Sequence, residues 1–145
     1  MTSGYRYLEE IATADVAFEA WGATREETFL AAADATLNTM VEEIGAVAPR
    51  ERRVFSLSSD SLDLLLFDLL QEIVYRKDAE RLLLRIRDLR IEVAGPGYRL
   101  RAEAAGETID SGRHALLADV KAVTFHRLAV ERTPSGWRAV VVLDV

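Results

Sequence analysis

A leucine-rich stretch, residues 62–73, places the strongest constraint on how this chain can fold. Its sequence, "LDLLLFDLLQEI", repeats apolar residues at helical spacing, and the preceding "SSD" offers Ser59 or Asp60 as the N-cap. Leu64 and Phe67 widen the apolar stripe, so we expect this helix to be covered on more than one side. The stripe consists of Leu62, Leu65, Leu66, Leu69, Leu70 and Ile73.

Another helix is predicted to begin after Thr24. Thr24 and Glu27 have the spacing of a capping box, in which each side chain satisfies an amide near the helix start. A one-sided apolar stripe follows, and Gly45 is expected to end the helix. The members of this stripe are Phe29, Ala33, Leu37, Met40, Val41 and Ile44.

Most of the remaining chain has the pattern of β-strands. Residues 16–22 and 54–58 each precede one of the helices. "LLLRIRDLRIEV" (residues 82–93) runs into a strong turn signal at residues 95–97, and residues 98–104 then alternate between apolar and charged side chains. Helices inserted among strands, followed by strands in series, predict an α+β fold, a two-layer sandwich of mostly antiparallel strands with two main helices.

The last two strands, residues 120–132 and 137–145, are predicted to form an antiparallel hairpin joined through "TPSG". A three-residue loop at positions 134–136 would set a register that pairs apolar residues with each other. A shift of one residue would instead put Phe125 or Arg127 opposite Asp144. The expected pairs are Val130 with Val140, Leu128 with Val142, and His126 with Asp144.

Composition limits the classes of function. The 145 residues suit one domain, residues 1–145, half of them are hydrophobic and 29% are charged, so we expect a globular, soluble protein. The net charge of −6 argues against non-specific binding of nucleic acid through a basic surface. The absence of cysteine rules out disulfides and thiolate metal sites. The N-terminal segment does not have the pattern of a secretory signal, and no apolar run has the length of a membrane span, so a cytoplasmic protein is expected.

No generic catalytic motif is present: there is no P-loop, dinucleotide fingerprint, nucleophile elbow or histidine pair for a metal. Asp15 stands where a strand begins, and the common interpretation of such a residue is a turn aspartate or strand cap. The alternative groups Asp15 with Asp144 and the terminal carboxylate of Val145. Three such groups would repel each other, and calcium, magnesium or manganese would relieve that repulsion.

The stretch "DSGRHALLADVKAVTFHRL" is the densest polar region. Residues 110–114 are expected to form a loop. Lys121 is expected on a strand, where a lone lysine is usually solvated. A histidine such as His126 is more often a hydrogen-bonded structural residue than a ligand.

Taken together, four segments resemble the archease family. They are "TADVAFEAWG", "LLLFDLLQEIVYRKDAERLLL", "RHALLADVKAVTFHRLAV" and "GWRAVVVLDV", which occur in the expected order and at the expected separations. The match runs essentially over residues 5–145. The resemblance implies an α+β fold related to strand–helix–strand–strand domains.

The resemblance also implies a function. Archeases activate the RtcB-type RNA ligase, which joins tRNA halves with GTP and manganese, by promoting its guanylylation and its multiple turnover. The implied metal ligands are Asp15, Asp144 and Val145, with calcium as the expected ion and magnesium or manganese as alternatives. Lys121 and His126 match family positions expected to serve the partner or activation. The chain would then be an assisting factor rather than an enzyme, with RNA reached only through the ligase.

One segment departs from the family pattern. Many archeases read "LEHTADV" or "LDHTADV", whereas this chain reads "LEEIATADV", with two added residues and Glu10 near the place of the histidine. The departure leaves Asp15 in place. Two rival functions stay open, a stand-alone metal-dependent hydrolase that uses a metal-bound water and a general protein chaperone.

Overall fold

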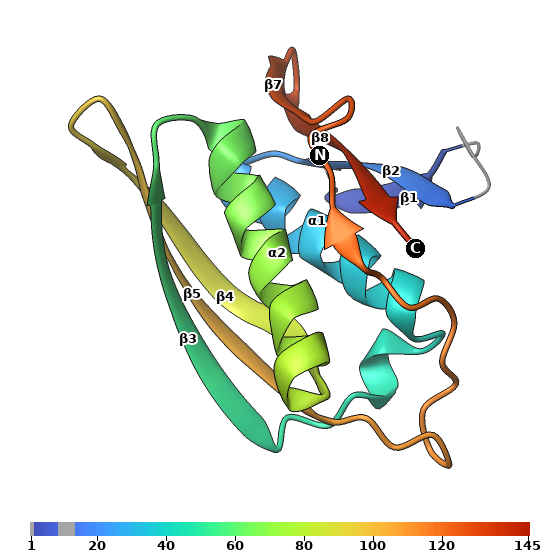
Figure 1. Ribbon diagram of the computed structural model, residues 1–145. Helices are drawn as coiled ribbons and strands as arrows, with labels where there is room; N and C mark the ends of the chain where they lie inside the picture. Colours follow the sequence, from blue (N-terminus) through green and yellow to red (C-terminus); the bar gives the residue numbers. More distant parts are fainter. Residues whose placement is uncertain (1, 9–13) are drawn as a thin grey trace.

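The computed structural model describes residues 2–8 and 14–145. Two long helices and eight strands follow one another along this part of the chain, with one short 3₁₀ helix between them (Figure 1). The elements are β1 (Gly4–Tyr7), β2 (Asp15–Gly22), α1 (Arg25–Met40), η1 (Ile44–Ala46), β3 (Glu51–Ser59), α2 (Leu62–Glu80), β4 (Leu82–Ala94), β5 (Gly97–Thr108), β6 (Ala122–Val123), β7 (Ala129–Thr133) and β8 (Gly136–Asp144).

The strands form two antiparallel sheets, and the two helices lie between them (Figure 1). One sheet has the order β1-β2-β8-β6, with β7 also paired to β8, and the other has the order β3-β5-β4. Helix α1 packs on β2 and β8 of the first sheet and on β4 of the second, while α2 contacts β3 to β5 on one side and β6 on the other. The predicted α+β class and antiparallel pairing are therefore confirmed, but the layers number three, because both helices are covered on two sides.

The apolar helix α2 explains this arrangement. All six residues of its predicted stripe are buried, and Leu65, Leu66, Leu69 and Leu70 have no exposed surface. A helix with apolar residues around much of its circumference must bury more than one face, and a sheet on each side achieves that. The expectation drawn from residues 62–73 is confirmed.

The ends of the helices differ from the predictions in detail. The Thr24 hydroxyl accepts the Glu27 amide at 3.1 Å, so the predicted cap of α1 is correct. Helix α1 ends at Met40 rather than at Gly45, because Val41 turns into an extended conformation and forms a β-bridge with Leu116. The cap of α2 is Ser61, not one of the two preceding residues, because the Ser61 side chain is the one that accepts the Leu64 amide.

The predicted register of the C-terminal hairpin is wrong by one residue. Thr133 pairs with Gly136, so the turn has two residues instead of three, and Ala129 instead of Val130 lies opposite Val140. The expected long strand is also divided into β6 and β7 by residues 124–128, so the rest of the predicted pairing fails as well. In β6 it is Ala122, not His126, that pairs with Asp144.

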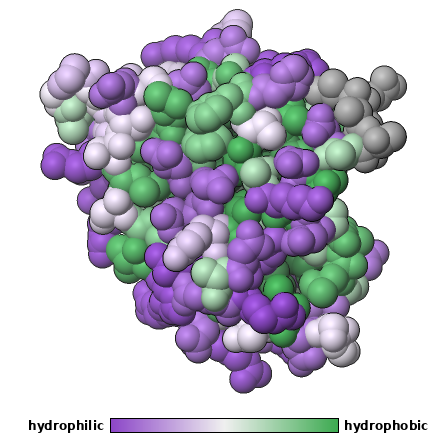
Figure 2. Space-filling model, viewed as in Figure 1, coloured by the Kyte–Doolittle hydropathy of each residue, from purple (hydrophilic) through white to green (hydrophobic). Residues whose placement is uncertain are grey.

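The surface mixes polar and apolar side chains. Figure 2 shows one face on which hydrophilic residues predominate and hydrophobic ones gather in small patches. Phe125 is the most exposed aromatic residue among the described residues. Its ring stacks on that of Phe67 at a centroid distance of 4.2 Å. Within the described residues, neither helix combines the length and the apolar character that a membrane crossing would require.

Candidate metal centre at the ends of two strands

Asp15 and Asp144 meet at one end of the five-stranded sheet. Asp15 is the first residue of β2, and Asp144 is the last residue of β8. Because the two strands are antiparallel, the start of one lies beside the end of the other, and their register places Asp15 directly opposite Asp144. Two carboxylates separated by 129 positions of sequence are thus cross-strand neighbours.

The hydrogen-bond pattern brings these two side chains especially close. The Val145 amide donates to the Ala14 carbonyl at 2.9 Å, so this neighbouring pair is hydrogen-bonded. Pairs alternate along an antiparallel ladder, which makes Asp15 and Asp144 a non-hydrogen-bonded pair, with Cα atoms about 4.5 Å apart and side chains on the same face. Like charges at directly opposite positions destabilise a sheet.

Both carboxylates face away from the helices. Ala17 and Val142 are the next pair on the same face of β2 and β8. Phe18 and Leu143, on the opposite face, belong to the hydrophobic core. Asp15 and Asp144 are each half-buried. Neither forms an ion pair with any lysine, arginine or histidine of the described residues, so the described side chains leave their mutual repulsion uncompensated.

The donor set fits a hard divalent cation. Two carboxylates supply oxygen ligands, which calcium, magnesium and manganese prefer. Val145 continues the strand, with its side chain packed against the core and its backbone carboxyl group one residue beyond Asp144. Among residues 2–8 and 14–145, no group of three or more histidine, cysteine, aspartate or glutamate side chains is placed to hold a metal. Backbone oxygens, the carboxyl group of Val145 or water would therefore have to complete the coordination.

The Lys121 backbone lies beside this acidic pair, whereas His126 is not paired with Asp144. The Lys121 amide donates to the Asp144 carbonyl at 2.8 Å, while its side chain is exposed. His126 lies in the segment that separates β6 from β7, is exposed, and donates its amide to the Thr124 hydroxyl at 3.2 Å. The structure therefore brings together four of the five predicted site residues, Asp15, Asp144, Val145 and Lys121.

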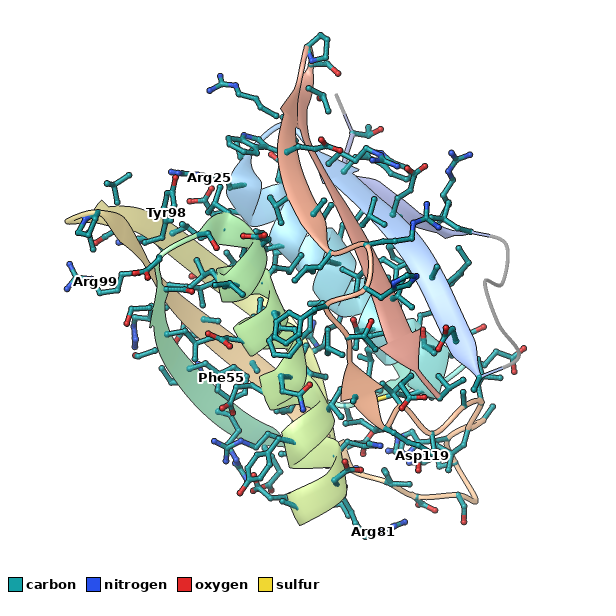
Figure 3. All side chains as sticks on the ribbon, turned by 45° about the horizontal axis from the view of Figure 1, so that its top comes forward. Arg25, Phe55, Arg81, Tyr98, Arg99 and Asp119 are labelled. Atoms are coloured by element: carbon teal, nitrogen blue, oxygen red, sulfur yellow. The ribbon has the colours of Figure 1, made fainter. Side chains whose placement is uncertain are left out.

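Helix α2 holds the strand next to Asp144 through two polar side chains that the sequence analysis missed. The Gln71 side chain accepts the Val123 amide at 3.1 Å. The buried Lys77 donates to the Val120 carbonyl at 2.6 Å and forms ion pairs with Asp78 and with Asp119, which Figure 3 labels near this end of the molecule. A signal for Lys77 was available, because it follows Ile73 by four residues and so continues the apolar stripe.

The charge on Lys77 is stabilised by its partners. Burial by itself would lower the pKa of this amine, but hydrogen bonds to Asp119 and Asp78 outweigh burial and raise the pKa above its ordinary value. Lys77 is therefore charged at neutral pH, and its three ammonium hydrogens match the three acceptor oxygens around it.

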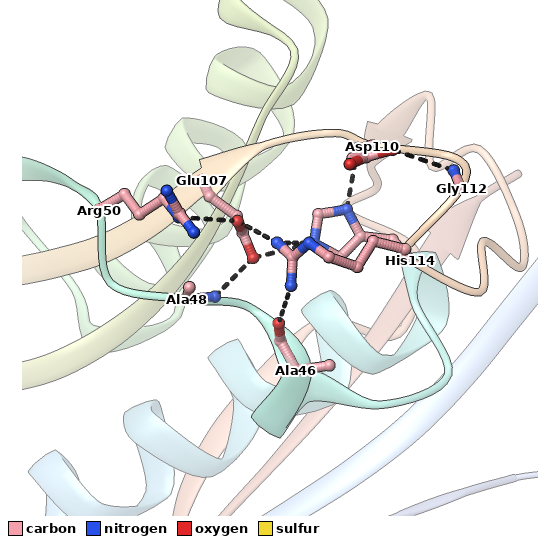
Figure 4. Close-up of polar contacts among 8 residues, drawn as sticks. Ala46, Ala48, Arg50, Glu107, Asp110, Gly112 and His114 are labelled. Carbon is pink, nitrogen blue, oxygen red and sulfur yellow. Dashed lines mark hydrogen bonds and ion pairs between the residues drawn. The ribbon is translucent and has the colours of Figure 1, made fainter.

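A separate polar cluster anchors the loop that leads to β6 (Figure 4). The His114 ring accepts the Asp110 amide at Nδ1, over 2.9 Å, so its Nε2 carries the proton that is directed at Glu107, 3.0 Å away. The Ala48 amide, the Arg113 guanidinium and His114 all donate to the buried Glu107 carboxylate, and together they lower its pKa to about 2. These groups satisfy one another, so the cluster reads as structural.

Glu10, which stands near the place of the family histidine, lies outside the described residues. The geometry above therefore rests on Asp15 and on the C-terminal strand alone.

Comparison with known proteins identifies the group to which the chain is related. The Archease protein family (MTH1598/TM1083) matches residues 5–145. Protein archease of Thermococcus gammatolerans is 37% identical over 134 residues, which cover 92% of this chain and 94% of that protein. Protein archease of Methanosarcina barkeri is 35% identical over 142 residues, covering 97% and 95% respectively.

Solved structures agree with the sequence comparison. The solution structure of Methanobacterium thermoautotrophicum protein 1598 has a TM-score of 0.84 and 31% identity, and the match covers 98% of this chain and 99% of that one. A crystal structure from Thermotoga maritima, described as an archease and possible chaperone, has a TM-score of 0.57 at 21% identity, covering 95% and 97%, and supports the fold alone. The family match over residues 5–145 and the similarity to these relatives show that the chain belongs to the archease family.

Proposed function

We propose that this protein is an activating cofactor of an RtcB-type RNA ligase. It would promote the GTP- and metal-dependent guanylylation of the ligase and its multiple turnover, in tRNA splicing or RNA repair. Membership of the archease family is the first support for this proposal. The observation that carries it is the pairing of Asp15 with Asp144, since two uncompensated carboxylates at a sheet end are what a divalent cation would stabilise.

The residues around this pair have distinct roles in the proposal. Asp15, Asp144 and the terminal carboxylate of Val145 hold the cation, with calcium as the expected ion and magnesium or manganese as alternatives. Lys121, exposed beside Asp144, contacts a phosphate or an acidic group of the ligase. A bound divalent ion supplies neutralisation of the negative charge that develops on a reacting phosphate. The protein has no turnover of its own in this scheme.

His126 keeps its expected role at the partner surface in the proposal. His126 does not pair with Asp144, so we assign it to the partner surface and not to the metal. Its segment, residues 124–128, interrupts the sheet on the same side of β8 as Lys121. Both exposed side chains are therefore available to a protein that docks on this end of the sheet.

The direct test is RNA ligation by the cognate ligase, present in amounts far below its substrate, with GTP and manganese. The proposal predicts that this protein converts a single-turnover burst into sustained ligation. Asp15→Asn and Asp144→Asn should abolish the stimulation, because each removes one charged ligand. As a matched control, Asp88→Asn removes a carboxylate from the other sheet and should stimulate like the wild type.

Extension of the chain tests the role of Val145. Residues appended after Val145 convert its carboxylate into an amide and add bulk beside Asp144, so stimulation should be lost, whereas an extension before residue 1 should be tolerated. Full stimulation by the C-terminally extended protein would remove Val145 from the site. If addition of the well-folded wild-type protein left the ligation kinetics unchanged, the cofactor function itself would be refuted.

The Asp15→Asn variant also separates the two rival functions, in two other assays. A stand-alone hydrolase would turn over a phosphoester substrate without the ligase and would lose that activity in Asp15→Asn. A general chaperone, the role attached in name to the Thermotoga maritima relative, would bind unrelated unfolded proteins and would be indifferent to that substitution.

A further inference from the structure

Strand β6 is too short to hold its own position. It contains only Ala122 and Val123, and it lies at the edge of its sheet, with a loop before it and the sheet interruption after it. On one side its segment bonds to β8, through the Lys121 amide to the Asp144 carbonyl and the Thr124 amide to the Val142 carbonyl. Isolated strand pairs of this length are marginal in water, so other contacts must keep it in place.

Helix α2 provides those contacts on the other side. The Val123 amide points away from β8, at an edge where it would lack a backbone partner, and the Gln71 side chain accepts it at 3.1 Å. Lys77 holds the Val120 carbonyl at 2.6 Å and binds Asp119. The two residues are six positions apart on α2. Lys77 therefore binds the chain just before β6, and Gln71 binds β6 itself.

Asp144 depends on β6 because of the ladder pattern. In a non-hydrogen-bonded pair the backbone amide and carbonyl of each residue point away from the partner strand. The backbone of Asp144 therefore bonds to the β6 segment, as its carbonyl does with the Lys121 amide, and not to Asp15. Without β6 the Asp144 backbone would lose its carbonyl partner, and beyond the Val16–Leu143 pair only the Val145 amide would, among the described residues, still bond the chain end to the β2 side. Chain ends held so weakly fray.

We infer that Gln71 and Lys77 are positioning residues for the candidate metal centre, which hold β6 against β8 and thereby fix Asp144 and Lys121. The metal part of this inference rests on the proposed function, while its effect on β6 does not. Burying a charged lysine is a costly way to stabilise a core, and an apolar residue of similar size would often serve stability as well or better. The position of the ammonium group, on the carbonyl just before Lys121, is what the charge achieves here.

Two substitutions test the inference, and they differ in charge. Gln71→Leu removes the acceptor without changing charge, and Lys77→Met removes the donor together with one positive charge. Lys77→Met should fold, because Asp119 and Asp78 are 74% and 53% exposed and would be left solvated, not buried without a partner. Gln71→Leu should fold because it leaves no unpaired charge and removes a single hydrogen bond. Lys77→Arg keeps a cationic donor and should restore part of what Lys77→Met loses.

The first measurement is amide hydrogen exchange in the metal-free protein. The amides of Lys121, Val123 and Val145 should exchange faster in both variants, while amides in α1 keep their wild-type rates. Arg76→Met is the control, because Arg76 is the neighbouring cation on α2 but, among the described residues, forms its ion pairs with Glu72 and Glu80 and not with the β6 segment. Unchanged exchange in β6 and at the end of β8 in both variants would overturn the inference.

The second measurement is the affinity for manganese, or for terbium as a luminescent probe, of the protein alone. We expect roughly tenfold weaker binding in both variants, the size of effect seen when groups that orient metal ligands are removed. If loss of charge were the only effect, Lys77→Met would bind cations more tightly, so the two explanations predict opposite signs. Wild-type affinity in both variants would refute the link between β6 and the metal. A wild type that binds neither ion would refute the proposed metal site, and hydrogen exchange alone would then decide on the positioning role.

Discussion

Replacing Asp15 by asparagine should stabilise the protein when metal is absent and destabilise it, relative to the wild type, when metal is present. The substitution keeps the size and shape of the side chain but removes one of the two like charges that lie opposite each other in the sheet. Most substitutions at a functional site change stability in one direction only. A reversal of the order between the two proteins is therefore a specific signature of a cation that offsets the repulsion.

The size of the effect follows from the spacing of the pair. For charges about 6 Å apart, Coulomb's law gives about 0.7 kcal/mol of repulsion in bulk water and about 3 kcal/mol at the lower effective dielectric of a protein surface. Because both side chains are half-buried and so partly screened, we expect a gain near 1 kcal/mol. For a chain of this length, that corresponds to a rise in melting temperature of about 3 °C.

Metal should reverse the order. A cation that binds only the folded state stabilises it by about 2.7 kcal/mol when its free concentration is one hundred times the dissociation constant. The wild type should gain this amount, and Asp15→Asn should gain little, so the wild type becomes the more stable protein by roughly 2 kcal/mol.

Thermal and chemical unfolding with a chelator, and then with calcium, magnesium or manganese, provide the assay. Asp88→Asn is the matched control, because Asp88 lies opposite Glu103 in the other sheet, also a like-charged pair, but far from the candidate site in the topology. Its effect should be the same with and without metal. If Asp15→Asn were less stable than the wild type in chelator, or if metal stabilised both proteins equally, the argument from repulsion would be wrong.

Two further predictions concern stability. Folding lowers the pKa of Glu107 from 4.5 to about 2. This carboxylate therefore contributes stability above about pH 4.5, and that stability is lost as the pH falls toward 2. The free energy of unfolding, measured across this pH range, should fall less steeply in Glu107→Gln than in the wild type. Leu66→Ala, at a fully buried position of α2, should cost about 3–5 kcal/mol in denaturant unfolding, while Leu64→Ala, at a position 41% exposed on the same helix, should cost much less. Similar losses at the two leucines would contradict the assignment of the buried face.

Local sequence patterns predicted the presence of the two helices, the cap of α1 and the turn between β4 and β5. The stripe of α2 is visible because helical periodicity depends only on residues a few positions apart, and the cap of α1 depends on Thr24 and Glu27 alone. The excess of apolar residues on α2 also required cover on more than one side. It did not reveal that a second sheet provides that cover, since this depends on where distant strands pack.

The register of the C-terminal strands was decided by the tertiary structure. A two-residue turn and the interruption at residues 124–128 move His126 away from Asp144, and each shifts the pairing without leaving a clear local signal. The interruption is stabilised by contacts with α2, including the stacking of Phe125 on Phe67. Such contacts join segments far apart in the chain, so no window of sequence contains them.

The candidate site shows the same division. The sequence by itself determined that a carboxylate begins one strand, that another ends the last strand, and that the chain resembles archeases. Only the tertiary structure decided that β2 and β8 are antiparallel neighbours in the register that sets Asp15 opposite Asp144. It also decided that Gln71 and Lys77 support the adjoining strand. The reason is physical: periodicity reports which face of an element is buried, whereas the pairing of two strand ends depends on the packing of every element between them.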